Sequence, residues 1–381
     1  MSLKQLVRLT SVLFLSVWVT FASSCAQVGN YEDRAASGGS VVDVLKLPGR
    51  IVYLRNEIIR LPNTNAHSKW LLQVMNASGT DNRHLLDDVG YTHPKWLQWG
   101  QQILIKKYEK GDNRNLDFKL LDVPTGKLEY AFSRNMPVEL DWNAQVSFSP
   151  DRKKVAARVK SGRLCIVNLS GKDSPICVEG GPIYQQPQWS PDGNKIAFSG
   201  CIDEWCNEFE IFTVNSDGTG VHQLTHIPSG ELDEENRRKF IPTPWTPSQS
   251  LTADGKLKYR QKSSFPRWSP DSERIVFDGW EGIYTMNADG TDLRQIISGG
   301  ACRYPVWSPD GTKIMYVCRR GGSGTMLPLG GILNYKSPIS NIYVSNADGT
   351  GEAQVTHNTY PADDDRAPLN VSLEAGFDWA P

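Results

Sequence analysis

The chain has 381 residues, with 41 Lys and Arg against 42 Asp and Glu, and its formal net charge is -1. This balance excludes bulk electrostatic attraction to nucleic acid, so we expect no nucleic-acid partner. The 33 glycines and 23 prolines are typical of a fold with many short strands and turns, and the length allows a large core.

The first 24 residues are predicted to be a signal peptide. Lys4 and Arg8 precede the apolar run 9–22, which is too short to span a bilayer comfortably. Small residues then lead directly to Cys25, which resembles a bacterial lipobox, so we expect Cys25 to be lipidated. Ala22 stands where that motif prefers Leu, and ordinary secretory cleavage is the alternative. Residues 25–49, rich in Gly, Ser and Ala at their centre, are predicted to be a flexible tether.

Two short motifs recur through residues 50–381. The first is WSPDG, at 189–193 and 307–311, with the variants WSPDS at 268–272 and FSPDR at 148–152. The second is NADGT with its variants, found within 72–81, 211–220, 283–292 and 341–350. Each motif supplies Pro, Asp or Gly for a tight turn between runs rich in β-branched and aromatic residues. One repeat therefore predicts a four-stranded antiparallel meander of about 40 residues, the length of one propeller blade.

These repeats resemble those of the TolB-type β-propeller family, whose repeat is related to the WD repeat. The resemblance covers nearly the whole chain after about residue 50 and implies an all-β propeller. Members of that family carry an additional N-terminal α/β domain, whereas this chain has only the short tether. The resemblance therefore implies an isolated propeller and gives little support for the family's role in the envelope.

Aromatic anchors before the first turn of each repeat predict six blades. They are Trp99, Phe148, Trp189, Trp268, Trp307 and Trp379. The chain ends in GFDWAP, where a repeat would continue into its second strand, and the run GRIVYL at 49–54 reads like that continuation. We therefore expect the strand at 377–381 to pair with 51–54 in a composite blade that leaves no open sheet edge. A seventh blade within 227–264 is the alternative, although that stretch lacks the two turn motifs.

The cysteines give an independent indication of the compartment. Without Cys25 six remain, and they form three sets, each flanking a turn or bend: Cys165 with Cys177, Cys201 with Cys206, and Cys302 with Cys318. Residues placed symmetrically about a hairpin face each other at the distance that a disulfide needs. We predict three disulfides within blades and an oxidising compartment; buried free thiols are the alternative.

The strand order predicts two unlike faces. In a meander the PDG and ADGT turns emerge at one end of the blades, and the long segments 107–117, 201–209, 228–264, 319–340 and 358–376 emerge at the other. Long loops on a rigid scaffold commonly carry binding. Aromatic and aliphatic anchors among charges suit a protein or glycan partner, and packing of the loops on one another is the alternative. The candidates are Trp205, Phe240, Trp245, Arg319, Arg320, Leu329, Tyr335, Asp363 and Asp364.

Catalytic and metal motifs are weak. The glycine-rich segment 321–324 lacks the strand–turn–helix context of a nucleophile elbow. The segment 287–292 resembles a calcium loop superficially but has no glutamate at the twelfth position. His226 and His357 occupy the same place in two repeats, without a third histidine in register. We therefore expect no cofactor and no metal.

Two functions remain open. The first is a monomeric, non-catalytic binding module on the periplasmic side of a bacterial envelope, held on the outer membrane by its lipid and docking another envelope protein or a cell-wall glycan; a soluble periplasmic or secreted form is the alternative location. The second is an envelope or secreted polysaccharide lyase or hydrolase, which needs converging carboxylates. Its candidates are Asp203, Glu204, Asp363, Asp364 and Asp365. The absence of a catalytic motif favours the first function.

Overall fold

The computed structural model describes the chain from residue 42 to residue 381, with gaps. The described ranges are 42–59, 67–87, 89, 94–97, 100–109, 112–132, 136–141, 144–179, 184–202, 208–226, 250–251, 257–258, 263–279, 282–299, 302–320, 323–326, 332–336, 339–357 and 377–381. Within them lie 28 strands and one short 3₁₀ helix, η1 (Val44–Lys46). No helix in these ranges is long and apolar enough to cross a membrane. The predicted signal peptide and Cys25 lie outside the described residues.

The chain forms two compact units. Unit 1 comprises Met1–Asp33 and Arg319–Ile339, and its described part contains an antiparallel hairpin of β24 (Ser323–Met326) and β25 (Ile332–Lys336). Unit 2 comprises Arg34–Cys318 and Ser340–Pro381. It holds six four-stranded sheets and a short pair of strands, β16 (Ser250–Leu251) and β17 (Leu257–Lys258). That pair is all that the described residues between 227 and 262 contribute, so the blades number six and not seven.

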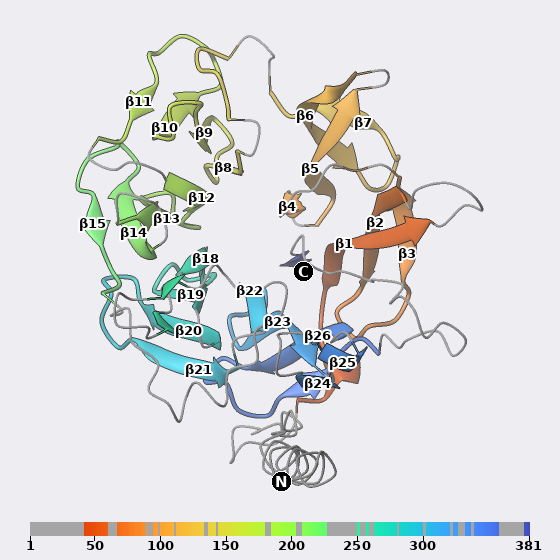
Figure 1. Ribbon diagram of the computed structural model, residues 1–381. Coiled ribbons are helices and arrows are strands. Elements are labelled where there is room, and N and C mark those ends of the chain that lie inside the picture. Colours follow the sequence, from red (N-terminus) through yellow and green to blue (C-terminus); the bar gives the residue numbers. More distant parts are fainter. Residues whose placement is uncertain are drawn as a thin grey trace, which may run out of the picture. The chain divides into compact units, whose positions relative to one another are not determined.

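The six sheets follow the chain and form a β-propeller, four antiparallel strands to a blade (Figure 1). Blade 1 contains β28 (Phe377–Ala380), β1 (Arg50–Ile59), β2 (His67–Asn76) and β3 (Arg83–Leu86). Blade 2 contains β4 (Lys95–Leu97), β5 (Gln102–Glu109), β6 (Asp112–Asp122) and β7 (Leu128–Tyr130). Blade 3 contains β8 (Val146–Phe148), β9 (Lys154–Arg158), β10 (Leu164–Asn168) and β11 (Ile176–Cys177).

Blades 4 to 6 repeat the same order from the innermost strand outward. Blade 4 contains β12 (Tyr184–Trp189), β13 (Lys195–Cys201), β14 (Phe209–Asn215) and β15 (His222–Gln223). Blade 5 contains β18 (Ser264–Trp268), β19 (Arg274–Gly279), β20 (Gly282–Asn287) and β21 (Arg294–Ser298). Blade 6 contains β22 (Cys302–Trp307), β23 (Lys313–Arg320), β26 (Ile339–Asn346) and β27 (Ala353–Gln354).

The predicted composite blade is confirmed. Strand β28 pairs antiparallel with β1, which places Trp379 opposite Ile51 and Phe377 opposite Tyr53. It also contacts β4 of blade 2 and β22 of blade 6, and Figure 1 shows the C-terminus among the innermost strands. The last strand of the chain therefore closes the ring and protects the inner edge of β1.

Apolar side chains fill the space between neighbouring blades. A buried cluster joins blades 6 and 1 through Met315, Ile51 and Trp379, and similar clusters join the other blades. Val42 and Leu47 belong to the first cluster, so the core begins before residue 50. Because the middle strands are covered on both faces, one blade alone could not bury its apolar surface, and the blades are stable only as a ring.

The Ser and Asp of each WSPDG-type turn explain why that motif recurs. In blade 4 the Ser190 hydroxyl donates to Asp192 Oδ1 at 2.5 Å and accepts from the backbone N–H of Lys195 at 2.9 Å. Asp192 Oδ1 also accepts from the Asn194 N–H at 3.1 Å. The same bonds recur in blades 3, 5 and 6. Two side chains thus satisfy the backbone of the turn without help from the rest of the blade.

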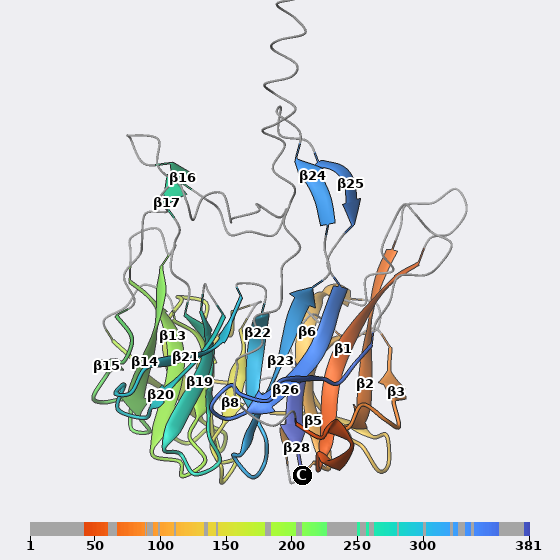
Figure 2. The same ribbon diagram turned by 90° about the horizontal axis from the view of Figure 1, so that it is seen from below.

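The two ends of the propeller differ, as the strand order requires. All first-to-second and third-to-fourth turns emerge at one end, here called the short-turn face, which lies at the bottom of Figure 2. The opposite end is the long-loop face. There β1 and β2 stay paired as far as Ile59 and His67, although β28 pairs with β1 only up to Tyr53. In blade 2, β5 and β6 also continue past the short strand β4. Blades 1 and 2 therefore extend two-stranded arms beyond their four-stranded bodies.

Candidate functional site: the central channel

The residue before each aromatic anchor holds the same register in the innermost strand of its blade. In blades 3 to 6 the anchor pairs with the residue seven positions later, as Trp307 does with Ile314. In blade 2 this register belongs to Trp96, which pairs with Ile103. The predicted anchor Trp99 is therefore wrong, because it comes too late in the sequence to pair with Ile103; it also lies outside the described residues. We name the residues before the six anchors the channel belt: Asp378, Lys95, Ser147, Gln188, Arg267 and Val306.

Hydrogen bonds link belt residues of different blades, and one of these bonds joins blades that are not neighbours in the ring. Lys95 Nζ of blade 2 donates to Gln188 Oε1 of blade 4 at 3.0 Å and to the carbonyl oxygen of Val146 at 3.2 Å. Arg267 Nη1 of blade 5 donates to the same Gln188 Oε1 at 2.9 Å. A bond from blade 2 to blade 4 crosses in front of blade 3, so these side chains meet in the channel. Two cations therefore share one neutral acceptor.

The fourth polar group of the belt is the carboxyl of Asp378. Its Oδ2 accepts a hydrogen bond from the backbone N–H of Trp96 at 2.9 Å. Within the described residues neither Lys95 nor Arg267 forms an ion pair with it. The belt thus places two cations and one carboxyl in the channel, with a net charge of one positive unit when all three are ionised.

Burial dominates the electrostatics of these groups. Burial and, to a smaller extent, the nearby charge of Arg267 together lower the pKa of Lys95 to about 7, against a smaller opposing effect of Asp378. Burial also lowers the pKa of Arg267 and raises the pKa of Asp378, which the charge of Arg267 partly offsets. All three changes have the same cause, since an apolar surrounding penalises the charged form of each group. Perturbed groups gathered in one hollow are typical of functional sites.

The belt forms the polar part of a cavity of about 450 Å³ that all six belt residues line. Its rim contains Pro191, Pro270 and Pro309 from three WSPDG-type turns, so the cavity lies toward the short-turn face. Its walls include Trp268 and Trp307, whose indole N–H groups donate to the carbonyl oxygens of the preceding blade's belt residues at 3.0 and 3.2 Å. The cavity therefore combines apolar walls with a few convergent polar groups, the usual composition of a small-molecule site.

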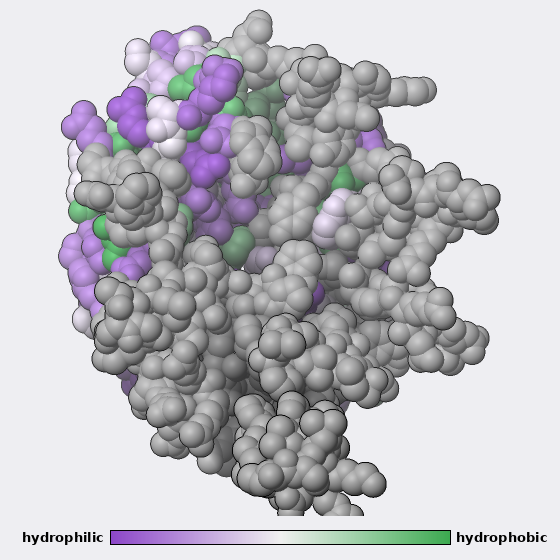
Figure 3. Space-filling model, viewed as in Figure 1, coloured by the Kyte–Doolittle hydropathy of each residue, from purple (hydrophilic) through white to green (hydrophobic). Residues whose placement is uncertain are grey.

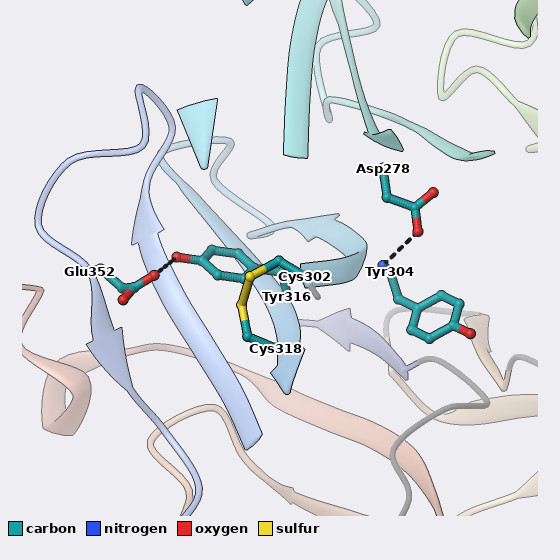
Figure 4. Close-up of a disulfide and its surroundings, with 6 residues drawn as sticks. All are labelled: Asp278, Cys302, Tyr304, Tyr316, Cys318 and Glu352. Atoms are coloured by element: carbon teal, nitrogen blue, oxygen red, sulfur yellow. Dashed lines mark hydrogen bonds between the residues drawn. A yellow bond between two sulfur atoms is a disulfide. The ribbon is translucent and has the colours of Figure 1, made fainter. Parts of the chain in front are cut away.

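A second buried carboxyl lies away from this cavity, beside a disulfide (Figure 4). Burial raises the pKa of Asp278 to about 7, and the charge of Arg303 opposes the change. Asp278 Oδ2 accepts a weak hydrogen bond from the Tyr304 N–H at 3.4 Å, while Oδ1 has no hydrogen-bond partner among the described residues. Asp278 connects blade 5 to blade 6, and we assign it no chemistry.

Another hollow, of about 360 Å³, lies between blades 5 and 6. Its cations already have partners: Arg294 forms an ion pair with Asp292 at 2.6 Å, and Arg274 stacks over Trp307 at 4.6 Å from the ring centroid. This hollow therefore differs from the channel belt, in which the cations meet no ionised partner directly.

Most of the site residues predicted on the long loops lie outside the described residues: Trp205, Phe240, Trp245, Leu329, Asp363 and Asp364. The same holds for the carboxylates of the enzymatic alternative, Asp203, Glu204 and Asp365. Tyr335 lies on β25, where only the backbone is described. Arg319 and Arg320 end strand β23, are partly buried, and both take part in interactions. The structure therefore leaves the long-loop site as a prediction.

Two of the three predicted disulfides are confirmed, Cys165–Cys177 and Cys302–Cys318. Each joins directly paired strands of one blade, as the symmetry about the turn predicted. Cys201 is also disulfide-bonded, and its predicted partner Cys206 lies outside the described residues.

The two histidines in equivalent places do not meet a third ligand in the described part of the chain. His226 Nδ1 lies 3.1 Å from Gln223 Nε2, and His357 is exposed. The described residues contain no group of three or more His, Cys, Asp or Glu that could hold a metal ion.

Surface hydrophobic residues are scattered over the described part of the chain. The large exposed ones are Leu45, Tyr130, Ile176, Ile202, Val221 and Leu293. In Figure 3 the described residues over β10–β15 are mainly hydrophilic, with isolated hydrophobic ones between them. The described surface in that view is therefore mainly polar.

The sequence reasoning missed the channel belt, although a signal was present. Lys, Gln, Arg and Asp stand directly before the tryptophans of KW, QW, RW and DW, at positions where a strand of the core would carry an apolar residue. Alignment of the repeats on their anchors would have placed these four polar residues in one ring. The misplaced anchor of blade 2 hid Lys95 from that alignment.

Comparison with known proteins gives the fold. No family model matches the chain. Among solved structures, TolB from Acinetobacter baumannii is 15% identical over 87% of this chain and 67% of that one, with a TM-score of 0.55. A puromycin hydrolase is 12% identical over 89% of this chain and 57% of that one, with a TM-score of 0.45. An oligogalacturonate lyase in complex with manganese is 14% identical over 81% and 74% of the two chains, with a TM-score of 0.42. At these identities the likeness shows the fold alone, and only the first TM-score is high enough to carry that argument. The chain is therefore a six-bladed β-propeller similar in fold to TolB.

Proposed function

We propose that this chain is an extracytoplasmic, non-catalytic binding module whose long-loop face docks another protein or a cell-wall component of the bacterial envelope. Two disulfides joining paired strands support the compartment, because such bonds persist in oxidising surroundings. The TolB-like propeller fold supports a rigid binding scaffold. We further propose that Cys25 carries a lipid that holds the mature protein on the periplasmic side of the outer membrane.

The observation that carries this proposal is the pair of arms on blades 1 and 2. Strands β1 and β2 remain in register to Ile59 and His67, and β5 and β6 remain paired to Glu109 and Asp112. Blades 1 and 2 are adjacent in the ring, since β28 of blade 1 contacts β4 of blade 2. Ordered hairpins that project from a rigid ring present a preorganised surface, which lowers the entropic cost of docking.

Site-specific photo-crosslinking tests the docking face. A photoreactive amino acid is introduced in the arms, at Glu57 or Tyr108, and, as matched controls on the short-turn face, at Lys153 or Asn194. We expect a discrete crosslinked species in intact cells from the arm positions and none from the controls. Equal patterns from both sets, or crosslinks from the short turns alone, would contradict docking through the long-loop face.

A separate experiment tests the proposed lipid anchor at Cys25. Metabolic labelling with a palmitate analogue should label the wild-type protein and not Cys25→Ser, and only the wild type should sediment with outer membranes. A wild-type protein that takes up no label and remains in the soluble fraction contradicts the lipid anchor and leaves the docking proposal intact.

The enzymatic alternative, a polysaccharide lyase or hydrolase, is not favoured by any described residue. Its candidate carboxylates lie outside the described ranges. The lyase and hydrolase among the compared structures have TM-scores of 0.42 and 0.45, which carry no argument.

A further inference from the structure

We propose that the channel cavity binds the carboxylate of a small ligand, which lies between Lys95 and Arg267 with its apolar stem against the tryptophan and proline walls. This inference does not depend on the docking proposal, because the cavity lies toward the short-turn face and the proposed docking surface is at the opposite end of the blades.

The first step is the number of hydrogen-bond donors on the side chains that line the cavity. A lysine ammonium has three N–H donors, and Lys95 uses two of them on Gln188 and Val146. A guanidinium has five, and Arg267 uses one on Gln188 among the described residues. Both side chains line the cavity. Both side chains are partly buried, so an acceptor that enters the cavity can take the remaining N–H donors in charge-assisted hydrogen bonds.

The second step is the charge of the missing acceptor. When Lys95, Arg267 and Asp378, which all line the cavity, are ionised, the belt has a net charge of one positive unit. A single negative charge neutralises the belt in that state, whereas a phosphate dianion would leave an excess of negative charge. The planar guanidinium also matches the two oxygens of a carboxylate in a parallel pair of hydrogen bonds.

The third step is the surroundings of that acceptor. Gln188 Oε1 holds both cations in place but is neutral, so it positions the donors without cancelling their charge. Trp268, Trp307 and Trp379 also line the cavity. A cavity of about 450 Å³ lies within the usual range of small-molecule sites. The ligand class is therefore a monocarboxylate on a short apolar stem. Either a free acid or the C-terminus of a peptide supplies that group.

Isothermal titration of the purified full-length protein tests this inference. The probes are hexanoate, its neutral isostere hexanamide, inorganic phosphate, and the peptide acetyl-Gly-Gly-Leu with a free or an amidated C-terminus. We expect saturable binding of hexanoate or of the free peptide at millimolar concentrations or below, and no binding of the two amides. Tighter binding of the peptide identifies a chain terminus as the source, and tighter binding of hexanoate identifies a free acid.

The decisive variant is Gln188→Glu, which keeps the size of the side chain and places a carboxylate on both cations. It should weaken carboxylate binding by about tenfold or more, since the internal carboxylate competes for the same donors. Arg267→Gln should weaken binding to a similar degree. Lys153→Met removes a positive charge from an exposed side chain on the same face, 79% accessible, and should leave binding unchanged. A melting curve for each variant shows that it folds.

Three results would overturn the proposal. They are wild-type protein that binds no carboxylate probe, hexanamide or phosphate binding as tight as that of hexanoate, and a folded Gln188→Glu protein with undiminished affinity. Each of these leaves the crosslinking result at the long-loop face untouched, so failure here is distinguishable from failure of the docking proposal.

Discussion

The aromatic anchor of the repeat and the residue directly before it differ in how much they vary among the six blades. The anchor is an aromatic residue in all six blades. It packs between blades, buried where it is a tryptophan, as at Trp189, Trp307 and Trp379, and partly buried at Phe148. The residue directly before it differs in every blade and is polar or charged in five of the six. The repeated position builds the ring, because its partners are alike everywhere. The unrepeated position supplies the channel belt, whose members complement one another across the ring.

This comparison explains where sequence reasoning succeeded. The turn motifs are local, since Ser308 and Asp310 satisfy the backbone of their own turn, and local chemistry is visible in one repeat. Six blades, the composite blade and two disulfides followed from it. The channel belt is not local: Lys95 and Gln188 are 93 residues apart in sequence. Its pairing depends on the register of blade 2, which the wrong anchor Trp99 concealed.

If the repeated aromatic anchors hold the ring together, removal of the closing strand β28 should lower the stability of the propeller more than any other change. Deletion of residues 377–381 removes the buried Phe377 and Trp379, each worth about 3–5 kcal/mol by analogy with truncation to Ala. That sum is comparable to the whole stability of a typical domain. We expect loss of cooperative thermal unfolding by circular dichroism. Deletion of Pro381 alone, which is exposed, is the control and should melt normally; a normal melt for the longer deletion would refute closure by β28.

The two turn motifs should differ in sensitivity, although both contain a glycine at positive φ. Gly349 of the NADGT turn has φ of +86°, and a Cβ there would lie 2.1 Å from the Ile296 carbonyl oxygen of the preceding blade. Gly311 of the WSPDG turn has φ of +69°, and a Cβ there would meet only the Pro270 ring, in ordinary contact with Cδ at 3.4 Å and Cγ at 3.9 Å.

Each alanine substitution places a Cβ in the left-handed backbone conformation, which costs about 1–2 kcal/mol. Only Gly349→Ala must also displace the backbone of Ile296. We expect Gly311→Ala to lose about 1 kcal/mol in urea unfolding and Gly349→Ala about 3 kcal/mol or more. Equal losses would mean that the NADGT glycine does not set the spacing between blades 5 and 6.

Asp278 lies outside the channel belt, so its substitution should change only the stability of the protein. The size of that change should depend on pH. Because the pKa of Asp278 is raised from 3.8 to about 7 by burial, its contribution to stability is complete below about pH 4 and is lost as pH rises through 7. Asp278→Asn should therefore unfold at nearly the wild-type urea concentration at about pH 3.5 and be more stable by about 2 kcal/mol or more at about pH 8. A constant difference across this range would show that Asp278 remains ionised in the folded protein.

The pKa of Lys95 in the free and in the ligand-bound protein tests the proposed carboxylate site most directly. Nuclear magnetic resonance of protein labelled at the lysine side chains follows each ammonium through a pH titration, and the Lys95→Met variant identifies the signal. We expect a Lys95 pKa of about 7 in the free protein. The pKa should increase clearly when hexanoate or the free peptide saturates the cavity, because a carboxylate favours the charged form. A pKa near the ordinary 10.5, or one that the saturating carboxylate leaves unchanged, would contradict the proposed site.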